Sequence, residues 1–323
     1  MSARELLYLS AADVLATGVT PREAREAVLR AFAALARGEA VSLPKSTIEI
    51  GPGHIFQAMS AASAGDGIAT VKWVAAAPVA AGAAGQGISG LICVSDRATG
   101  APLAVLDGDE VTLVRTAAMS AAAAVHLAPA APRSIGFVGC GRQALAHLDA
   151  FADLFPGLER ALAFSRSEAS ARRLVEAAGG IGLAGEVVPD ADDLVRRSDI
   201  VVSMVPGAPG LRAFLDARLL PAHAFVSAVD IGRSWLPASL GAFDVLATDS
   251  LAQSKAPYDV DTKPVEGVAF STDLGQMASG AWTMAAPGRT MFCFRGLGIA
   301  DLALAGLVVA KARSLGIGTP LPR

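Results

Sequence analysis

The sequence predicts an α/β protein with two domains. Its 323 residues are more than one ordinary hydrophobic core serves. Residues 41–115 form short β-like runs separated by glycines, which indicates a mixed sheet. After residue 134, strands alternate with helices, as in the βαβ units of a parallel sheet. The change of pattern indicates two differently built domains in one chain.

The first half begins with helices. Ser10 followed by Asp13 marks one helix start, and Thr20 followed by Pro21 marks another. Apolar residues then recur every three or four positions, so a helix is expected from Pro21 to Arg37. β-like runs follow over residues 46–50, 55–59, 69–74, 88–95 and 102–107.

An alanine-rich helix over residues 113–127 leads into the second half, where Pro129 with Pro132 marks a domain boundary. The apolar strand Ser134–Val138 runs into a glycine-rich loop and a helix through about Leu154. Further strands are expected over residues 161–164, 200–204, 224–228 and 245–247, and further helices over 168–178, 191–197 and 298–315. The last helix allows the C-terminus to fold back onto the first domain.

Composition and charge exclude several classes of protein. With 27 Lys+Arg against 30 Asp+Glu, the formal net charge is −3, which argues against a nucleic-acid partner. The longest uncharged stretch, residues 74–95, holds four glycines and a proline, so no membrane span is expected. No signal peptide is recognisable, and the three cysteines lack a CxxC spacing. We expect a cytoplasmic protein without a metal site.

The glycine-rich loop has the spacing of a dinucleotide-binding site. Gly139 permits the tight turn, Gly141 lets the backbone approach a pyrophosphate, and Ala144 permits close helix packing. Arg142 and Gln143 complete the loop at the start of the helix. The alternative is a glycine-rich turn without a ligand, and the position between strand and helix favours binding.

The residues that end the next strand bear on the choice of cofactor. Ser165, Arg166 and Ser167 offer an arginine and two hydroxyls with no carboxylate, which suits a 2′-phosphate and favours NADP(H) over NAD(H). Glu159 precedes this strand instead of ending it. Arg166 as a solvated surface residue is the alternative. Val205 and Pro206, after a later strand, are expected beneath the nicotinamide.

The chain resembles the ornithine cyclodeaminase and mu-crystallin family over nearly its whole length. The resemblance is carried by residues 71–73 (VKW), 96–104 (DRATGAPLA), 113–121 (LVRTAAMSA), 139–144 (GCGRQA) and 296–301 (GLGIAD). Members reduce imines, dehydrogenate amino acids or cyclise ornithine with bound NAD. The resemblance implies a Rossmann dinucleotide-binding domain (residues 119–301) inserted into an α+β substrate-binding and dimerisation domain (residues 1–118 and 302–323). It also implies a homodimer.

The resemblance further implies which residues hold the substrate. Lys45, Lys72 and Arg115 correspond to the positions that bind the carboxylate of an imino or amino acid, and Thr116 belongs to the cofactor site. Lys45 departs from the arginine usual at its position. Lys72 lies in an apolar strand, where burial would lower its pKa toward use in proton transfer. An outward strand lysine is the alternative.

One departure from the family pattern bears on the reaction. Gly232 stands where true cyclodeaminases carry an aspartate thought to act on the amine, and Asp230 replaces a glycine two residues earlier. Asp230 either orients substrate or nicotinamide or is a turn residue. The sequence therefore favours an imine reductase over a cyclodeaminase or a non-catalytic NADPH-binding protein. Residues 230–235 resemble the branch with iminosuccinate reductases, and Arg233 adds charge compatible with a dicarboxylate.

Overall fold

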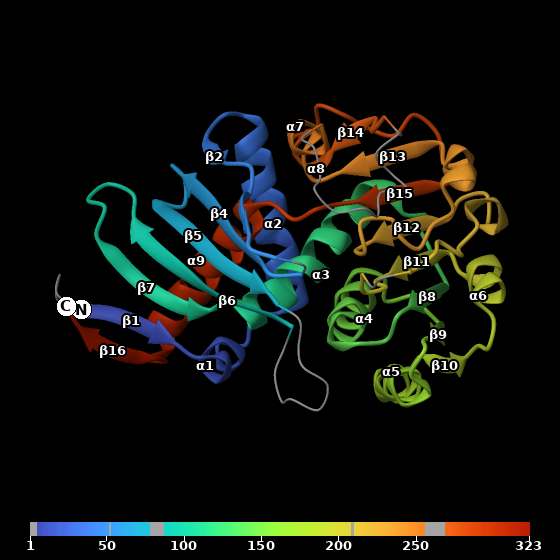
Figure 1. Ribbon diagram of the computed structural model, residues 1–323, viewed down its shortest axis with the longest axis horizontal. Helices are drawn as coiled ribbons and strands as arrows, with labels where there is room; N and C mark the ends of the chain where they lie inside the picture. The colour runs from blue at the N-terminus through green and yellow to red at the C-terminus, as the bar shows by residue number, and fades with distance from the viewer. Residues whose placement is uncertain (1–4, 52, 78–86, 208–209, 256–268) are drawn as a thin grey trace. The chain divides into compact units, whose positions relative to one another are not determined.

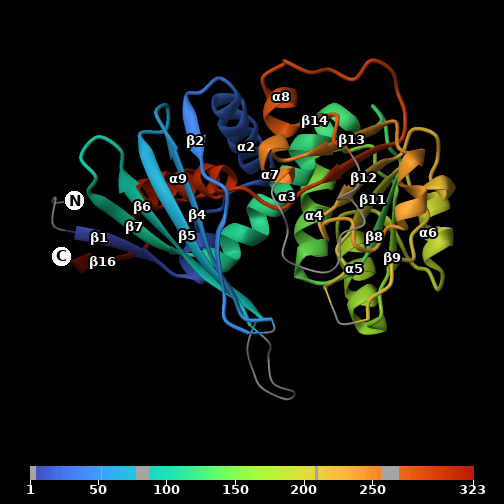
Figure 2. The same ribbon diagram turned by 45° about the horizontal axis from the view of Figure 1, so that its top comes forward.

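The computed structural model describes residues 5–51, 53–77, 87–207, 210–255 and 269–323 (Figures 1 and 2). The chain divides into two compact units. Unit 1 comprises residues 1–115 and 296–323, and unit 2 comprises residues 116–295. The division falls inside helix α3 (Gly108–Leu127), directly after Arg115. Pro129 and Pro132 therefore follow this helix and do not separate the two units.

Unit 1 is built on an eight-stranded sheet in the order β16-β1-β7-β6-β5-β4-β2, with β3 paired to β4. Strand β1 is parallel to β7, and the other pairings are antiparallel, which confirms the predicted mixed sheet. The strands are β1 (Glu5–Leu9), β2 (Ala40–Ser42), β3 (Ser46–Glu49), β4 (Ile55–Ser63), β5 (Ile68–Ala76), β6 (Ile88–Asp96), β7 (Pro102–Asp107) and β16 (Thr319–Pro322).

The helices of unit 1 begin at the capping residues that the sequence indicates. Ser10 with Asp13 opens α1 (Ala11–Ala16), and Thr20 with Glu23 opens α2 (Pro21–Ala36), each as a capping box. Helix α9 (Gly298–Leu315) packs against α2 and against strands β4, β5 and β6 (Figure 1). One face of this sheet is therefore covered by α9.

Unit 2 holds a second eight-stranded sheet, in the order β10-β9-β8-β11-β12-β15-β13-β14, and every pairing in it is parallel. Figures 1 and 2 show helices α4 and α5 on one face and α6 on the other. The strands are β8 (Ser134–Val138), β9 (Arg160–Phe164), β10 (Ala184–Val187), β11 (Ile200–Ser203), β12 (Phe225–Ala228), β13 (Val245–Thr248), β14 (Thr272–Asp273) and β15 (Thr290–Cys293). The helices are α4 (Arg142–Leu154), α5 (Glu168–Gly180), α6 (Ala191–Arg197), α7 (Leu251–Ser254) and α8 (Leu274–Ala278), with 3-10 turns η1 (Ala217–Leu219) and η2 (Pro237–Ala242).

The strand order of unit 2 determines where a ligand can bind. The chain moves outward from β8 to β9 and β10 on one side, and then returns to β11 and β12 on the other. Ligands of open parallel sheets bind at the carboxyl ends of the strands beside such a reversal. The reversal here lies between β8 and β11. Among the described residues, no helix is long and apolar enough to cross a membrane.

Candidate functional site

The glycine loop after β8 has the geometry that the sequence predicts. Gly139 has a φ of +93°, and a Cβ added there would lie 2.9 Å from the Met204 carbonyl oxygen, so only glycine fits. A Cβ on Gly141 would meet nothing within 4 Å. Packing within the chain therefore gives no reason for glycine at Gly141. Space beside an open helix N-terminus is what a pyrophosphate needs.

Neighbouring loops meet the glycine loop at the carboxyl ends of the strands. The Gly139 amide donates to the Phe164 carbonyl oxygen at the end of β9 (2.9 Å), and the Met204 amide at the end of β11 donates to the Val138 carbonyl oxygen (2.9 Å). Residues 139–144, 165–167 and 204–207 thus form one edge of the unit 2 sheet. The structure brings most of the predicted cofactor residues together there.

The first turn of α4 is held by a buried polar chain. His147 Nδ1 lies 2.7 Å from the Gln143 carbonyl oxygen, and His147 Nε2 lies 2.9 Å from Ser120 Oγ. Since a carbonyl only accepts, Nδ1 carries the proton and Nε2 accepts from Ser120. Ser227 of β12 in turn donates to Ser120 (2.8 Å), and Thr116 lies one helical turn before Ser120. Burial lowers the pKa of His147 to about 4, so its ring is neutral and serves as a fixed brace.

The loop after β9 presents the predicted polar residues at the surface. Ser167 caps α5 by accepting from the Ser170 amide (3.3 Å), and its own amide donates to Ser165 Oγ (3.3 Å). Arg166 is exposed between them. Glu159 lies at the opposite end of β9 and forms an ion pair with Arg133 (2.6 Å). No carboxylate lies within residues 165–167, as the sequence indicates.

Asp230 organises a tight turn in unit 2. Its carboxylate accepts from the Ser203 hydroxyl (3.1 Å), the Ser234 hydroxyl (2.6 Å) and the Gly232 amide (3.1 Å). A longer bond of 3.4 Å comes from the Val205 amide. Burial raises the pKa of Asp230 above its usual value, while the hydroxyl and amide donors act to lower it. The side chain thus fixes the loop that contains Val205 and Pro206.

A second group of predicted residues meets in unit 1, on the sheet face that α9 covers. Lys72 on β5 is 1% exposed and Arg115 on α3 is 7% exposed. Both reach the same oxygen of Asp301 on α9: Lys72 Nζ lies 2.8 Å and Arg115 Nε 3.1 Å from Oδ1. Lys72 also donates to Thr112 Oγ1 (3.2 Å). Lys72 is therefore not an outward strand residue.

Burial, more than the neighbouring charges, lowers the pKa of Lys72. Burial, and to a smaller extent the charges of Arg115 and Lys45, lower the pKa of Lys72 to about 8, although Asp301 acts in the opposite direction. Lys45 follows β2 and is half-buried. Lys45 and Arg115 thus both act on Lys72 within unit 1, while Asp230 belongs to unit 2.

Asp301 is the residue of this group that the sequence analysis did not select as a site residue. It stands in the motif 296–301, and it is fully buried at 0% exposure. A carboxylate among the apolar residues of the first turns of α9 was the available signal, because a buried charge requires a partner. Among the described residues, no group of three or more His, Cys, Asp or Glu side chains is placed to hold a metal ion.

Known sequences resemble the chain over most of its length. The profile of the ornithine cyclodeaminase/mu-crystallin family matches residues 5–315. The chain belongs to this family. An alanine dehydrogenase of Archaeoglobus fulgidus is 28% identical over 312 residues, which cover 93% of each chain. An iminosuccinate reductase of Paracoccus denitrificans is 28% identical over 230 residues, covering 69% of this chain and 70% of the relative.

Solved structures of the ornithine cyclodeaminase/mu-crystallin family confirm the predicted fold class. An archaeal alanine dehydrogenase dimer with bound NAD superposes with a TM-score of 0.85 at 26% identity, covering 98% of this chain and 99% of that one. A Δ1-pyrroline-2-carboxylate reductase of Thermococcus litoralis reaches a TM-score of 0.87 at 24% identity, covering 98% and 100%. These proteins share the α/β architecture of a Rossmann-type parallel sheet and a second, mostly antiparallel sheet.

Proposed function

We propose that the chain is an NAD(P)H-dependent reductase of 2-imino acids, or the amino acid dehydrogenase of the reverse direction. The observation that carries this proposal is the buried pair of cations, Lys72 and Arg115, which share one counter-ion. Two cations that lie side by side in a buried place favour an anionic ligand, and the carboxylate of an imino or amino acid is such an anion. Relatives named as alanine dehydrogenase and iminosuccinate reductase support the same reaction class.

The residues of unit 1 have defined tasks in this reaction. Arg115 binds the substrate carboxylate, and Lys72 neutralises it. With a pKa of about 8, Lys72 is mostly protonated at neutral pH and can donate a proton to the imine nitrogen. The hydride for the imine carbon would come from a reduced nicotinamide when this cofactor is bound. Lys45 provides a further positive charge near this group.

The loops of unit 2 are proposed to hold the cofactor. Gly139, Gly141 and the first turn of α4 would hold the pyrophosphate, and the loop of Val205 and Pro206 would lie beneath the nicotinamide. Asp230 supports that second loop as a positioning residue. Gly232 in place of the cyclodeaminase aspartate disfavours ornithine cyclisation, because no carboxylate stands at that position to act on the amine.

For the cofactor we propose NADP(H) over NAD(H). Arg166 is exposed at the end of β9, with the hydroxyls of Ser165 and Ser167 beside it in the chain. Arg166→Ala should raise KM for NADPH about tenfold and leave KM for NADH unchanged. Arg173→Ala, which removes an exposed arginine of α5, serves as the control. A wild-type KM that is lower for NADH than for NADPH would contradict the preference.

We also propose a homodimer, formed through the sheet face of unit 1 that α9 does not cover. Apolar side chains that lie on neighbouring strands are exposed there. Trp73 pairs with Leu91 and Val71 with Cys93 in the strand register, and Tyr8 lies on the same sheet. Trp73 is 47% and Leu91 49% exposed. Contiguous apolar surface of this kind is typical of an interface between subunits.

For the substrate we propose iminosuccinate first. The Asp301 carboxylate balances one of the buried cations, so a second substrate carboxylate requires another positive group, for which Lys45 and Arg233 are the candidates. Arg233 donates from Nη1 to the Val205 carbonyl oxygen (3.3 Å), and its buried Nε has no hydrogen-bond partner among the described residues. Arg233→Met should lower kcat/KM for iminosuccinate about tenfold or more without affecting that for the imine of pyruvate.

The experiment that tests the function measures the absorbance of NADPH or NADH with purified protein. Oxaloacetate, pyruvate and other 2-oxo acids are added with ammonia or methylamine. Amine-dependent oxidation of the cofactor is the expected result, and it identifies both substrates. If reduced cofactor binds but no pair is reduced, the reductase proposal is wrong, and release of ammonia from ornithine should be measured instead.

A further inference from the structure

Asp301 joins three elements of unit 1 at one buried point. It lies in the first turn of α9. Its Oδ1 atom forms ion pairs with both the Lys72 ammonium of β5 and the Arg115 guanidinium of α3. Its other oxygen, Oδ2, is buried and has no hydrogen-bond partner among the described residues. The two ion pairs therefore use only one of the two carboxylate oxygens of Asp301.

The backbone before α9 is shaped to allow this contact. Gly296 has a φ of +83°, and a Cβ there would lie 3.0 Å from Arg115 Nη1. Any larger residue would press on the guanidinium. Gly298 likewise packs closely against β4, where a Cβ would lie 3.1 Å from the Ser60 carbonyl oxygen. The two glycines let the start of α9, and with it Asp301, come close to the cations.

Electrostatics gives the reason for such a contact. Two cations buried side by side repel one another and lose their hydration, so either one would lose its charge or the pair would move apart. Lysine is the weaker base of the two, and the charges that act on it are those of Arg115, Lys45 and Asp301. Of these three, only Asp301 favours the charged form of Lys72.

We propose that Asp301 is a positioning residue whose single oxygen holds the Lys72 ammonium and the Arg115 guanidinium side by side, and whose charge lets both cations remain buried. The proposal deepens the reductase proposal and rests on it for the use of the two cations. The effect of Asp301 on Lys72 itself does not depend on the reaction. It can therefore be measured without a substrate.

The first test is the pH dependence of the free energy of unfolding. In the unfolded chain Lys72 titrates near its ordinary value, above its folded pKa of about 8. Stability from this group therefore rises with pH above about 8 in the wild type. In Asp301→Asn the Lys72 pKa should fall by a further one to three units or so, so this rise starts earlier. The stability deficit of the variant should shrink between about pH 6 and pH 8 and stay constant above.

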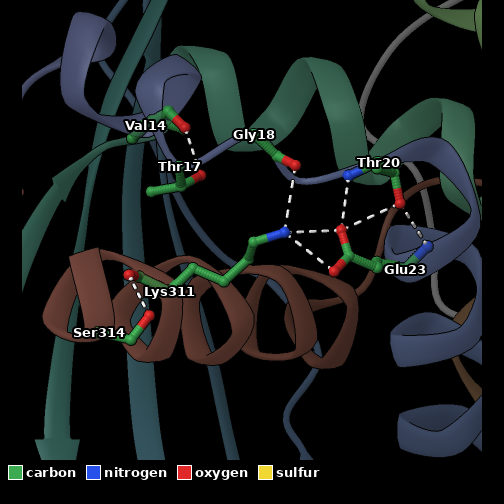
Figure 3. A network of polar contacts seen from close by, with 7 residues as sticks. All are labelled: Val14, Thr17, Gly18, Thr20, Glu23, Lys311 and Ser314. Atoms are coloured by element: carbon green, nitrogen blue, oxygen red, sulfur yellow. Dashed lines mark hydrogen bonds and ion pairs between the residues drawn. The ribbon is translucent and has the colours of Figure 1, made fainter.

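The control is a second ion pair, between Lys311 on the same helix α9 and Glu23 on α2. Figure 3 shows the Lys311 ammonium of α9 directed at the Glu23 carboxylate, with nitrogen to oxygen distances of 2.8 and 2.9 Å, and at the Gly18 carbonyl oxygen (3.1 Å). Thr20 donates to the same carboxylate (2.8 Å). The pKa of Glu23 is lowered to about 2, chiefly by Lys311, so Glu23→Gln should give a deficit that is constant from pH 6 to pH 8.

The second test uses activity. For Asp301→Asn, the alkaline fall of kcat/KM should begin about one to three pH units lower than in the wild type. Asp301→Glu keeps the charge but moves the oxygen, so it should keep the wild-type pH profile while lowering kcat/KM. The free energy of unfolding gives a further control. In a Lys72→Met background, the stability deficit caused by Asp301→Asn should not depend on pH, because the titrating amine is gone.

The outcomes separate the two proposals. A deficit for Asp301→Asn that is as flat between pH 6 and pH 8 as that for Glu23→Gln, together with an unmoved alkaline limb, overturns the role of Asp301. If Asp301→Asn does not fold, an Asp301→Glu profile displaced to lower pH overturns it as well. If the wild-type protein has no reductase activity, but the stability deficit of Asp301→Asn depends on pH as expected, the role of Asp301 is supported and the proposed reaction is refuted.

Discussion

Lys72 shows how much depends on a single side chain. Its strand neighbours Val71 and Trp73 face away from α9, whereas Lys72 is buried on the covered face. The alternation of a strand therefore places one cation in an apolar interior. A lysine in such a place is retained at a cost in stability, which is reasonable only where the charge has a use.

The pH dependence of activity follows from this burial. Since Lys72 must be protonated to bind the carboxylate and deliver a proton, kcat/KM should fall about tenfold per pH unit above about pH 8. A bound carboxylate favours the charged amine, so the fall of kcat should lie at higher pH than that of kcat/KM. Initial rates from pH 6 to pH 10 measure both, and a flat profile above pH 8 would exclude Lys72 as the acid.

Substitution of Lys72 gives a second prediction. Lys72→Met keeps the buried methylenes and removes the charge, and it should lower kcat/KM by at least about 100-fold. Fluorescence titration should show unchanged binding of NADPH, because the glycine loop lies in unit 2. Lys311→Met is the control of the same chemistry, and it should retain activity. Retained activity of Lys72→Met would remove Lys72 from the mechanism.

Lys72 and Arg115 were predicted from the sequence to be site residues, whereas Asp301 was not. The resemblance to the family implied the roles of the two cations, because each lies in a short segment that carries this resemblance, residues 71–73 and 113–121. Asp301 lies 229 positions beyond Lys72, and its importance arises only when α9 packs on β5. Sequence spacing carries no information about such a contact. Asp230 was left open between two readings for the same reason.

At the scale of an element, the turn between β8 and α4 contains one glycine that folding requires and another for which we expect a role in ligand binding. Gly139 is required by its backbone angle and by the nearby Met204 carbonyl, whereas Gly141 is in open space. Gly139→Ala should therefore lower the unfolding free energy by about 1 kcal/mol or more. Gly141→Ala should leave stability nearly unchanged and weaken NADPH binding about tenfold or more.

Chemical denaturation and cofactor titration check both changes. Gly180→Ala at the end of α5 is the control, since a Cβ there also meets nothing within 4 Å. It should alter neither measurement strongly. If Gly141→Ala binds NADPH as the wild type does, the pyrophosphate does not approach this residue.

The turn that follows β12 is expected to be a structural element with a large effect on stability. Asp230→Ala removes the acceptor of two hydroxyls and of backbone amides, so it should lower the unfolding free energy by about 3 kcal/mol. Asp192→Ala, at a half-exposed helix pair 3.8 Å from Arg196, should cost about 0.5 kcal/mol or less. A small loss for Asp230→Ala would contradict this reading.

Regular elements were predictable where the local pattern is strong. Strand β8, helix α6 and helix α9 have the predicted limits, because a continuous apolar run marks β8, Asp190 caps the start of α6 and Gly316 ends α9. The strands that were not predicted are β1, β2, β10, β14, β15 and β16. They are short, and β1 and β16 depend on each other across more than 300 residues, since Glu5 pairs with Pro322. Such strands acquire their conformation from pairing and not from propensity.

The whole molecule is expected to work as a dimer. Trp73→Lys places a charge at the centre of the open face of the unit 1 sheet, and sedimentation should show a shift from dimer to monomer. Ile181→Lys is a matched control, because Ile181 in unit 2 is equally exposed at 47%. A wild-type monomer at micromolar concentration, or a dimeric Trp73→Lys variant, would contradict the proposed interface.

The order of elements along the chain also has a consequence for biosynthesis. Unit 2 is continuous in sequence, but its strand β15 lies between β12 and β13. Its sheet is therefore complete only when residues 290–293 have left the ribosome. Unit 1 needs α9 and β16, which are translated last. Until then Lys72 and Arg115 have no Asp301 beside them. A nascent chain that ends before residue 296 therefore has all of unit 2, while the sheet of unit 1 still exposes the apolar face that α9 later covers, and exposed apolar surface of this kind favours aggregation.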